Sequence, residues 1–366
     1  MIGIITKLKN IASILIIITI VCAFFTNAEI LNDSVIQSLN FCYYTIIPSL
    51  FPYMIISSLF SRSYHINQAL SAIFKKIFSV LGICRIYTSQ IILGNLCGFI
   101  NGPKSICEHY NTKTSNYDFN KAITLSSNAG LSFVVFIVGI KLWQNIYFGI
   151  VLYFFQVIVS FLINFSRNSK SKFVSVEFKN QDPYQIFSSS ITSSAKTIFN
   201  ICAFTIFSSL LVNILTSILN IKNSSCIYVL LSSFVDITQG VKSSLSLQNN
   251  FLCAFFTGFS VGFGGLSVAF QTFSICAKFK VIYKKFILMK FIQGIICGLF
   301  ASIFASLFDI EPKLNTSILT LSNNSTSKFV STVSIFLFFI VTSVDFFENI
   351  IYNNIIKEKG ENHGRK

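Results

Sequence analysis

Apolar stretches long enough to cross a lipid bilayer recur along this chain and are separated by short polar links. Hydrophobic residues make up 53% of its 366 residues, whereas charged residues make up only 11%. A helix needs about 20 apolar residues to cross the hydrocarbon core, where every backbone amide has to be paired within the protein. The sequence therefore predicts an all-α polytopic membrane protein and excludes a soluble globule.

The basic residues of the chain follow the links between its apolar stretches. The formal net charge is +15, and such a charge on a soluble domain would suggest nucleic-acid binding. Lysine and arginine in short links are instead what the cytoplasmic loops of membrane proteins carry. We therefore expect the lipid bilayer as a partner and no nucleic acid.

The sequence contains no catalytic or metal-binding pattern. Its ten cysteines and three histidines include no Cys-x-x-Cys pair and no histidine cluster, so the spacings of zinc and haem sites cannot be assembled. No apolar stretch combines a histidine or cysteine with a neighbouring base, and none holds a pair of carboxylates. We expect no metal, no cofactor and no enzymatic activity.

The apolar stretches predict eight membrane spans. The first could also be a signal peptide cleaved near Ala28, but its apolar run is long for a signal core, and we favour an uncleaved helix. Pro48 and Pro52 should kink or break the second span. Residues 29–40 hold no basic residue and are expected as an external loop, and residues 61–85 as a cytoplasmic helix at the interface. The expected spans are 11–25, 41–60, 122–140, 146–165, 196–220, 251–277, 286–308 and 331–351.

Two further apolar stretches, 86–107 and 225–245, have polar centres at 98–104 and 236–240. If the first stretch crossed the membrane, the basic loop at 167–179 would lie outside, against the positive-inside rule. If it enters and returns, this loop and both chain termini lie in the cytoplasm. We therefore expect two re-entrant hairpins. The same topology places five lysines in the cytoplasm, namely Lys278, Lys280, Lys284, Lys285 and Lys290.

The two hairpins belong to two similar units of opposite orientation. In both units a helix that can kink is followed by a polar hairpin and then by a span broken by small and polar residues. An inverted repeat of this kind is the usual plan of secondary transporters, with the substrate at the midplane. The expected organisation is an N-terminal helix and external loop (1–40), a first repeat (41–166), a cytoplasmic linker (167–189), a second, inverted repeat (190–308), and an external loop, last span and cytoplasmic tail (309–366).

Candidate substrate-binding residues lie at the hairpin tips and in the two broken spans. A helix interrupted at mid-membrane exposes amides that suit an anion and carbonyls that can hold a cation; close helix packing at small residues is the alternative. Asp236 is a candidate coupling residue for a proton or a sodium ion, or else a cap that binds the amides of Thr238 or Gln239. Lys104 and Lys242, one after each tip, would attract an anion or extend to the interface. The substrate-binding candidates are Asn101, Gly102, Ser127, Asn128, Gly130, Thr238, Gln239, Gly264, Gly265, Ser267 and Gln271.

Five motifs, in chain order, carry a family resemblance. Across about residues 41–308 the chain resembles the YlbJ-type (SpoVV) sporulation integral membrane proteins, whose nucleoside-recognition, or Gate, repeats resemble concentrative nucleoside transporters. It departs from that family in the first hairpin, which lacks a tyrosine and a second glycine, and at Leu131, where the family commonly has proline. The motifs are Pro48-Ser49-Leu50-Phe51-Pro52, Gly98-Phe99 with Gly102-Pro103, Ser127-Asn128-Ala129-Gly130, Asp236-Ile237-Thr238-Gln239-Gly240, and Gly265-Leu266-Ser267-Val268 with Gln271.

The resemblance implies transport of dipicolinic acid from the mother cell across the outer forespore membrane of a spore-forming bacterium. Dipicolinate is a flat dianion, which suits helix amino ends and hairpin amides. A carrier of a nucleoside or another small metabolite is the alternative within the same class, and a non-transporting scaffold of the forespore envelope is the alternative from another class. The residues by themselves predict a transporter only, and they leave the coupling ion and a homo-oligomeric state open.

Overall fold

The structure is a computed structural model that describes residues 28–80, 82–110, 114–165, 182–223 and 225–312. All of them belong to the first of the two units into which the chain divides, Met1–Asn315. Within these residues every regular element is helical, as the sequence predicts. The spans expected at 11–25 and 331–351, and the tail, lie outside the described residues.

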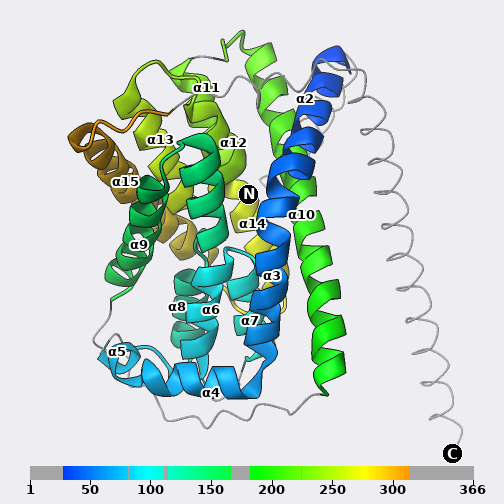
Figure 1. Cartoon of the computed structure of the whole chain (residues 1–366), viewed down its shortest axis with the longest axis vertical. Helices are drawn as coiled ribbons and strands as arrows, with labels where there is room; N and C mark the ends of the chain where they lie inside the picture. The colour runs from blue at the N-terminus through cyan, green and yellow to red at the C-terminus, as the bar shows by residue number, and fades with distance from the viewer. Residues whose placement is uncertain (1–27, 81, 111–113, 166–181, 224, 313–366) are drawn as a thin grey trace, which may run out of the picture. The chain divides into compact units, whose positions relative to one another are not determined.

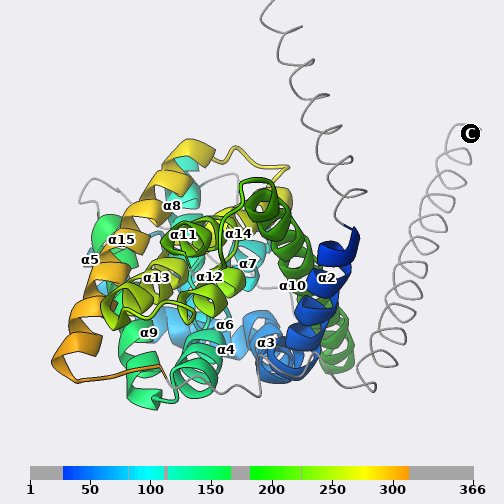
Figure 2. The same cartoon turned by 90° about the horizontal axis from the view of Figure 1, so that it is seen from above.

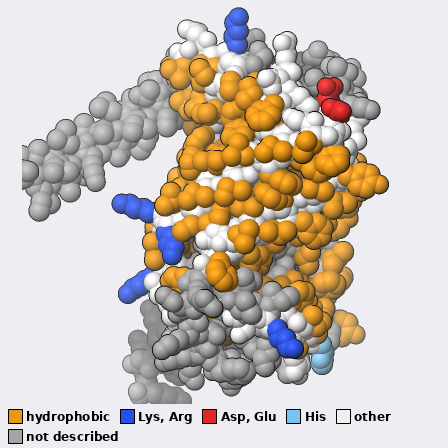
Figure 3. All heavy atoms as spheres, turned by 90° about the vertical axis from the view of Figure 1, so that its left-hand side faces the viewer, with side chains coloured by type: hydrophobic (Ala, Val, Ile, Leu, Met, Phe, Trp, Pro, Cys, Tyr) orange, Lys and Arg blue, Asp and Glu red, His pale blue; other side chains and the backbone are white. Residues whose placement is uncertain are grey.

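Among the described residues, five helices are long and apolar enough to cross a membrane. Their outward faces carry large apolar side chains, such as Phe154, Leu162 and Ile303, each more than half exposed. Figure 3 shows hydrophobic side chains over most of one face, and an apolar surface of this extent is unusual for a soluble monomer. The five helices are Leu31–Arg62, Ile146–Ile163, Tyr184–Ile218, Asn250–Ile275 and Tyr283–Leu307.

The first of these long helices is made of three pieces, α2 (Ala28–Phe41), the π-helical turn η1 (Cys42–Ile46) and α3 (Ile47–Arg62). The external loop expected at 29–40 is therefore wrong, because this segment is helical and packs on α10, where Leu31 contacts Ile214. Proline lacks an amide hydrogen and crowds the preceding turn. The widened π-helical turn just before Pro48 accommodates this, so the helix continues instead of breaking.

The stretch 61–85, expected as one helix at the interface, contains two helices, α4 (Tyr64–Ile73) and α5 (Lys75–Val80). Figure 1 shows α4 lying across one end of the bundle, at a steep angle to α3. The buried amide of Asn67 holds this corner, since its Nδ2 donates to the carbonyls of Ser61 and Ser63 at 2.7 and 2.8 Å.

Each of the two predicted hairpins is a pair of short helices packed side by side. The first pair is α6 (Thr88–Cys97), which follows the turn η2 (Arg85–Tyr87), and α7 (Asn101–Glu108); the second is α11 (Cys226–Val235) and α12 (Ile237–Ser244). Helices of this length rise only about 12–15 Å, half of a hydrocarbon core. Figure 1 places the first pair in the lower half of the bundle and the second in the upper half.

Both spans predicted to be broken are interrupted where the small and polar residues lie. The first consists of α8 (Asn116–Ser126), an irregular segment at 127–130, and the π-helical η3 (Ser132–Leu142); the second consists of α13 (Asn250–Phe263) and α14 (Gly265–Ile275). The second interruption is confined to Gly264 and Gly265, whose φ angles are both +82°, a conformation that glycine adopts without strain.

The remaining long helices are α9 (Ile146–Ile163), α10 (Pro183–Ile218) and α15 (Tyr283–Leu307). The repeat boundary expected at residue 190 falls inside α10, because Asp182 caps this helix by accepting from the Tyr184 amide and Pro183 is its first residue. In the view of Figure 2, α6, α7, α12 and α14 lie in the middle, with α3, α9, α10 and α15 around them.

Candidate functional site

Three of the four helix breaks line one pocket inside the bundle, together with α14, the helix that follows the fourth break. This pocket is lined by Gly98 and Asn101 from the first hairpin, by Gly130 from the first broken span, and by Asp236 and Gln271 from the second half of the chain. The pocket holds about 640 Å³ of empty space, including the part that is open to the outside. Apolar side chains of η1, α3 and α10 complete its wall: Ile46, Leu50, Met54 and Ile201.

In the first half of the chain, the hairpin break packs directly on the break in the following span. Gly98 has a φ of +103°, and a Cβ on Gly130 would lie 2.8 Å from the carbonyl carbon of Cys97. One helical turn further on, a Cβ on Gly102 would clash with the backbone of Ser126. Glycine is therefore required at this crossing for steric reasons.

The second half of the chain repeats this arrangement. A Cβ on Gly265 would lie 2.8 Å from the Cα of Asp236, at the break of the second hairpin. One turn further on, a Cβ on Gly240 would clash with the side chain of Ser260. The two halves thus bring a hairpin break and a broken span into the same kind of contact.

Asp236 acts as the cap of the second hairpin's second helix. Its Oδ2 accepts hydrogen bonds from the amides of Thr238 at 2.9 Å and Gln239 at 3.2 Å, and its side chain is 2% exposed. This is the capping geometry that was one of the two expectations for this residue. The carboxylate also lies on the pocket wall, so the capping role does not remove it from the site.

Asn128 turns its side chain away from the pocket and into the protein. Its Oδ1 accepts from Lys290 Nζ at 2.8 Å and from Gln293 Nε2 at 2.9 Å, and its Nδ2 donates to Asn95 Oδ1 at 2.6 Å. The residue is 1% exposed and does not line the pocket. Asn128 therefore holds the broken segment in place through hydrogen bonds on the side that faces away from the pocket.

Lys290 is buried in the middle of the bundle, with 1% of its surface exposed. The cytoplasmic position expected for it is wrong: it lies two turns into α15, where its ammonium also donates to Gln293 Oε1 at 3.0 Å. A basic residue inside an apolar helix, instead of before it, is the sequence signal that could have identified it. Gln156 of α9 joins the same network, since its Nε2 donates to the carbonyl of Ala129 at 2.7 Å.

Some of the remaining predicted site residues line the pocket, and the others do not. Gln271 is on the wall and donates to Ser267 Oγ at 3.2 Å, while its Oε1 has no hydrogen-bond partner among the described residues. Thr205 and Ser132 also line the pocket, although no sequence motif singles them out. Asn101, Gly130, Asp236, Thr238 and Gln271 are on the wall, and Gly102, Ser127, Asn128, Gln239, Gly264, Gly265 and Ser267 are not.

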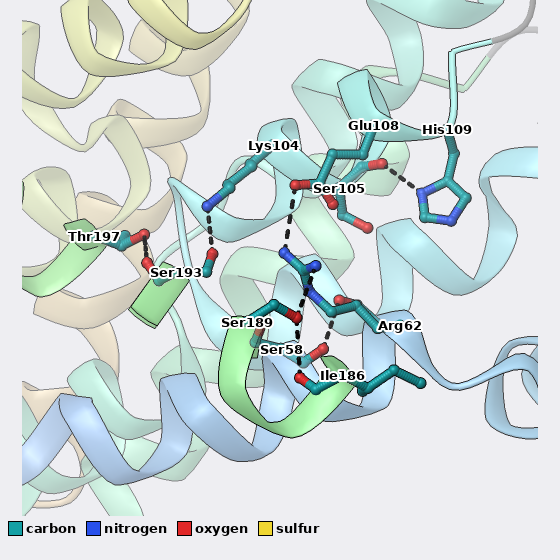
Figure 4. Close-up of polar contacts among 11 residues, drawn as sticks. Ser58, Arg62, Lys104, Ser105, Glu108, His109, Ile186, Ser189, Ser193 and Thr197 are labelled. Atoms are coloured by element: carbon teal, nitrogen blue, oxygen red, sulfur yellow. Dashed lines mark hydrogen bonds and ion pairs between the residues drawn. The ribbon is translucent and has the colours of Figure 1, made fainter. Parts of the chain in front are cut away.

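The two hairpin lysines differ in their surroundings. Lys104 donates to Ser193 Oγ of α10, next to the ion pair between Arg62 and Glu108 (Figure 4). Lys242 lies over the ring of Phe41, 5.8 Å from its centroid. None of the described residues that line the central pocket is basic.

Comparison of the chain with protein-family models, with curated proteins and with solved structures finds no match in any of the three.

Proposed function

We propose that this chain is a membrane transporter for a small metabolite and that its substrate binds in the pocket between the helix breaks. The observation that carries the proposal is this convergence: breaks from three parts of the sequence, together with the helix α14 that follows the fourth break, line one pocket. Irregular backbone at membrane depth persists only where it is buried in protein or lines a cavity. Secondary transporters place their binding sites at such breaks.

The matching contacts of the two halves support an inverted repeat. α3, α6–α7, α8–η3 and α9 occur in the same order as α10, α11–α12, α13–α14 and α15, and the two hairpins lie in opposite halves of the bundle (Figure 1). We propose the full plan of eight spans and two re-entrant hairpins on this basis, with both termini in the cytoplasm. Alternating access would then move one repeat against the other around the pocket.

We propose dipicolinate as the substrate and the outer forespore membrane of a spore-forming bacterium as the location. Both rest on the motifs Ser127-Asn128-Ala129-Gly130 and Gly265-Leu266-Ser267-Val268 with Gln271, which resemble those of sporulation membrane proteins. The apolar walls of the pocket, including Phe133 and Met54, suit a flat aromatic ring.

A neutral, nucleoside-like substrate is the second candidate, and Asp236 favours it. A carboxylate on the pocket wall repels a dianion, and its two amide donors are already occupied. Gln271, with an unpaired oxygen within the described part of the chain, suits the neutral donor groups of a nucleobase or ribose.

Uptake by the full chain in proteoliposomes tests these proposals directly. We expect saturable uptake of radiolabelled dipicolinate that excess unlabelled dipicolinate abolishes and uridine does not. Uptake of uridine alone would establish the second candidate, and uptake of neither by correctly inserted protein would favour the scaffold. Ile303→Leu, a change on the outward face of α15, serves as the matched control. In a null strain, normal spore dipicolinate would contradict the sporulation role.

A further inference from the structure

We propose that a second, smaller pocket beside the central one is a carboxylate-binding vestibule, in which Arg62 and Lys104 receive an anionic substrate before it enters the central pocket. This inference rests on the proposed transport function and adds a site to it. The vestibule would also supply the positive charge for an anionic substrate that the wall of the central pocket lacks, since none of the described residues on that wall is basic.

The vestibule lies between the end of α3, the first hairpin and α10. It holds about 350 Å³ of empty space, including its open side, and Arg62, Lys104, Ser105 and Glu108 line it. Asn101, at the hairpin break, lines both this pocket and the central one. The two pockets are therefore neighbours along the hairpin. Figure 4 shows the basic side chains of α3 and α7 facing the serines of α10.

Three donors of the vestibule are available to a carboxylate. The Lys104 ammonium has a neutral hydroxyl, Ser193 Oγ, as its hydrogen-bond partner. Ser105 is 6% exposed, and its Oγ has no hydrogen-bond partner in the part of the chain that the structure describes. Together with the Arg62 guanidinium, these groups match the oxygens of a carboxylate, which forms its strongest hydrogen bonds with charged donors.

A carboxylate of the chain itself already occupies this site. Glu108 Oε1 lies 3.7 Å from Arg62 Nη2, and the two side chains are 41% and 21% exposed. This distance is longer than a charge-assisted hydrogen bond, and exposed ion pairs contribute little to stability. Arg62 also donates to Ser189 Oγ at 3.3 Å, so its position does not depend on Glu108. A substrate carboxylate can therefore replace Glu108 at Arg62, and Glu108 acts as its competitor.

Initial rates of dipicolinate uptake into proteoliposomes test this assignment. We expect Arg62→Met and Lys104→Met each to raise KM about tenfold with kcat little changed, because the central pocket stays intact. Lys104→Arg should restore most of the affinity, and Glu108→Gln should lower KM about threefold. Lys284→Met, a change at an exposed lysine of α15 that lines neither of these pockets, is the matched control. Unchanged KM in both methionine variants, or an equal rise in the control, would overturn the vestibule and leave the transport function standing.

Binding to detergent-solubilised full chain separates failure of the vestibule from failure of the proposed function. The probes are dipicolinate and benzoate, and the readout is the dissociation constant from calorimetry. If the wild type moves no dipicolinate, the transport of this substrate is wrong. Binding of both probes that weakens about tenfold in Arg62→Met and Lys104→Met would still support the vestibule. Absence of binding to the wild type, or equal binding to all variants, would overturn it.

Discussion

The span broken at residues 127–130 and the span broken at Gly264 are interrupted by different means. In the first, side chains hold an irregular segment in place: Lys290 and Gln293 bind Asn128, and Gln156 binds the carbonyl of Ala129. In the second, the backbone itself makes the break, through two glycines with positive φ, of which Gly264 packs against the ring of Phe99 and Gly265 against the backbone of Asp236. The stability of the first break should therefore depend on the polarity of its side chains, and the stability of the second on the small volume of its glycines.

The largest loss of unfolding free energy is expected from a substitution at the second break. Gly265→Ala places a methyl group 2.8 Å from the Cα of Asp236 and forces alanine to a φ of +82°. Strain and overpacking together should cost about 4 kcal/mol of unfolding free energy. Thermal unfolding of the detergent-solubilised protein, followed by size-exclusion chromatography, measures the loss. Phe270→Leu, an exposed change on the same helix, should leave stability unchanged. A Gly265→Ala protein as stable as the wild type would mean that the close crossing at Asp236 is not obligatory.

The positions of the breaks could be predicted from the sequence because glycine, proline and polar residues within apolar stretches cannot continue a buried regular helix. The residues that contact those breaks could not be predicted from the sequence. The sequence predicts that Asn128 faces the substrate. The side-chain amide of a residue in a broken span can, however, form hydrogen bonds either toward the pocket or toward the neighbouring helices. Only the packing of α15 determines which of these directions Asn128 takes. The charge pattern places Lys290 in the cytoplasm, because a sequence does not show that amide oxygens surround its ammonium. The sequence does not predict helix α2, because half of its 14 residues are polar; only the packing shows that one of them, Ser34, accepts a hydrogen bond from Asn213 of α10.

The second-largest loss of unfolding free energy is expected from a substitution at the first break. Asn128→Ala removes the oxygen that accepts from both Lys290 and Gln293 and leaves a buried ammonium with one acceptor among the described residues. This should cost about 3 kcal/mol. Lys290→Met should cost only about 1 kcal/mol, because Gln293 still satisfies Asn128 Oδ1 and no buried charge remains.

A double-mutant cycle on the same stability measurement tests this coupling. The double variant should be less destabilised than the sum of the two single variants, because the ammonium left unpaired by Asn128→Ala is absent from it. Ser127→Ala, which removes a hydroxyl without a partner in the described residues, is the control and should be neutral. Additive losses would show that Lys290 does not support Asn128.

The smallest effect on stability, and the sharpest test of the difference between the breaks, concerns Asp236. Its carboxylate caps α12 through the amides of Thr238 and Gln239. Asparagine accepts the same hydrogen bonds, so Asp236→Asn should change the unfolding free energy by less than about 0.5 kcal/mol, whereas Asp236→Ala should cost about 1 kcal/mol. If the carboxylate only caps the helix, Asp236→Asn also keeps normal uptake in proteoliposomes. Loss of uptake in a stable Asp236→Asn protein would instead assign its charge to the coupling of transport to a proton or a sodium ion.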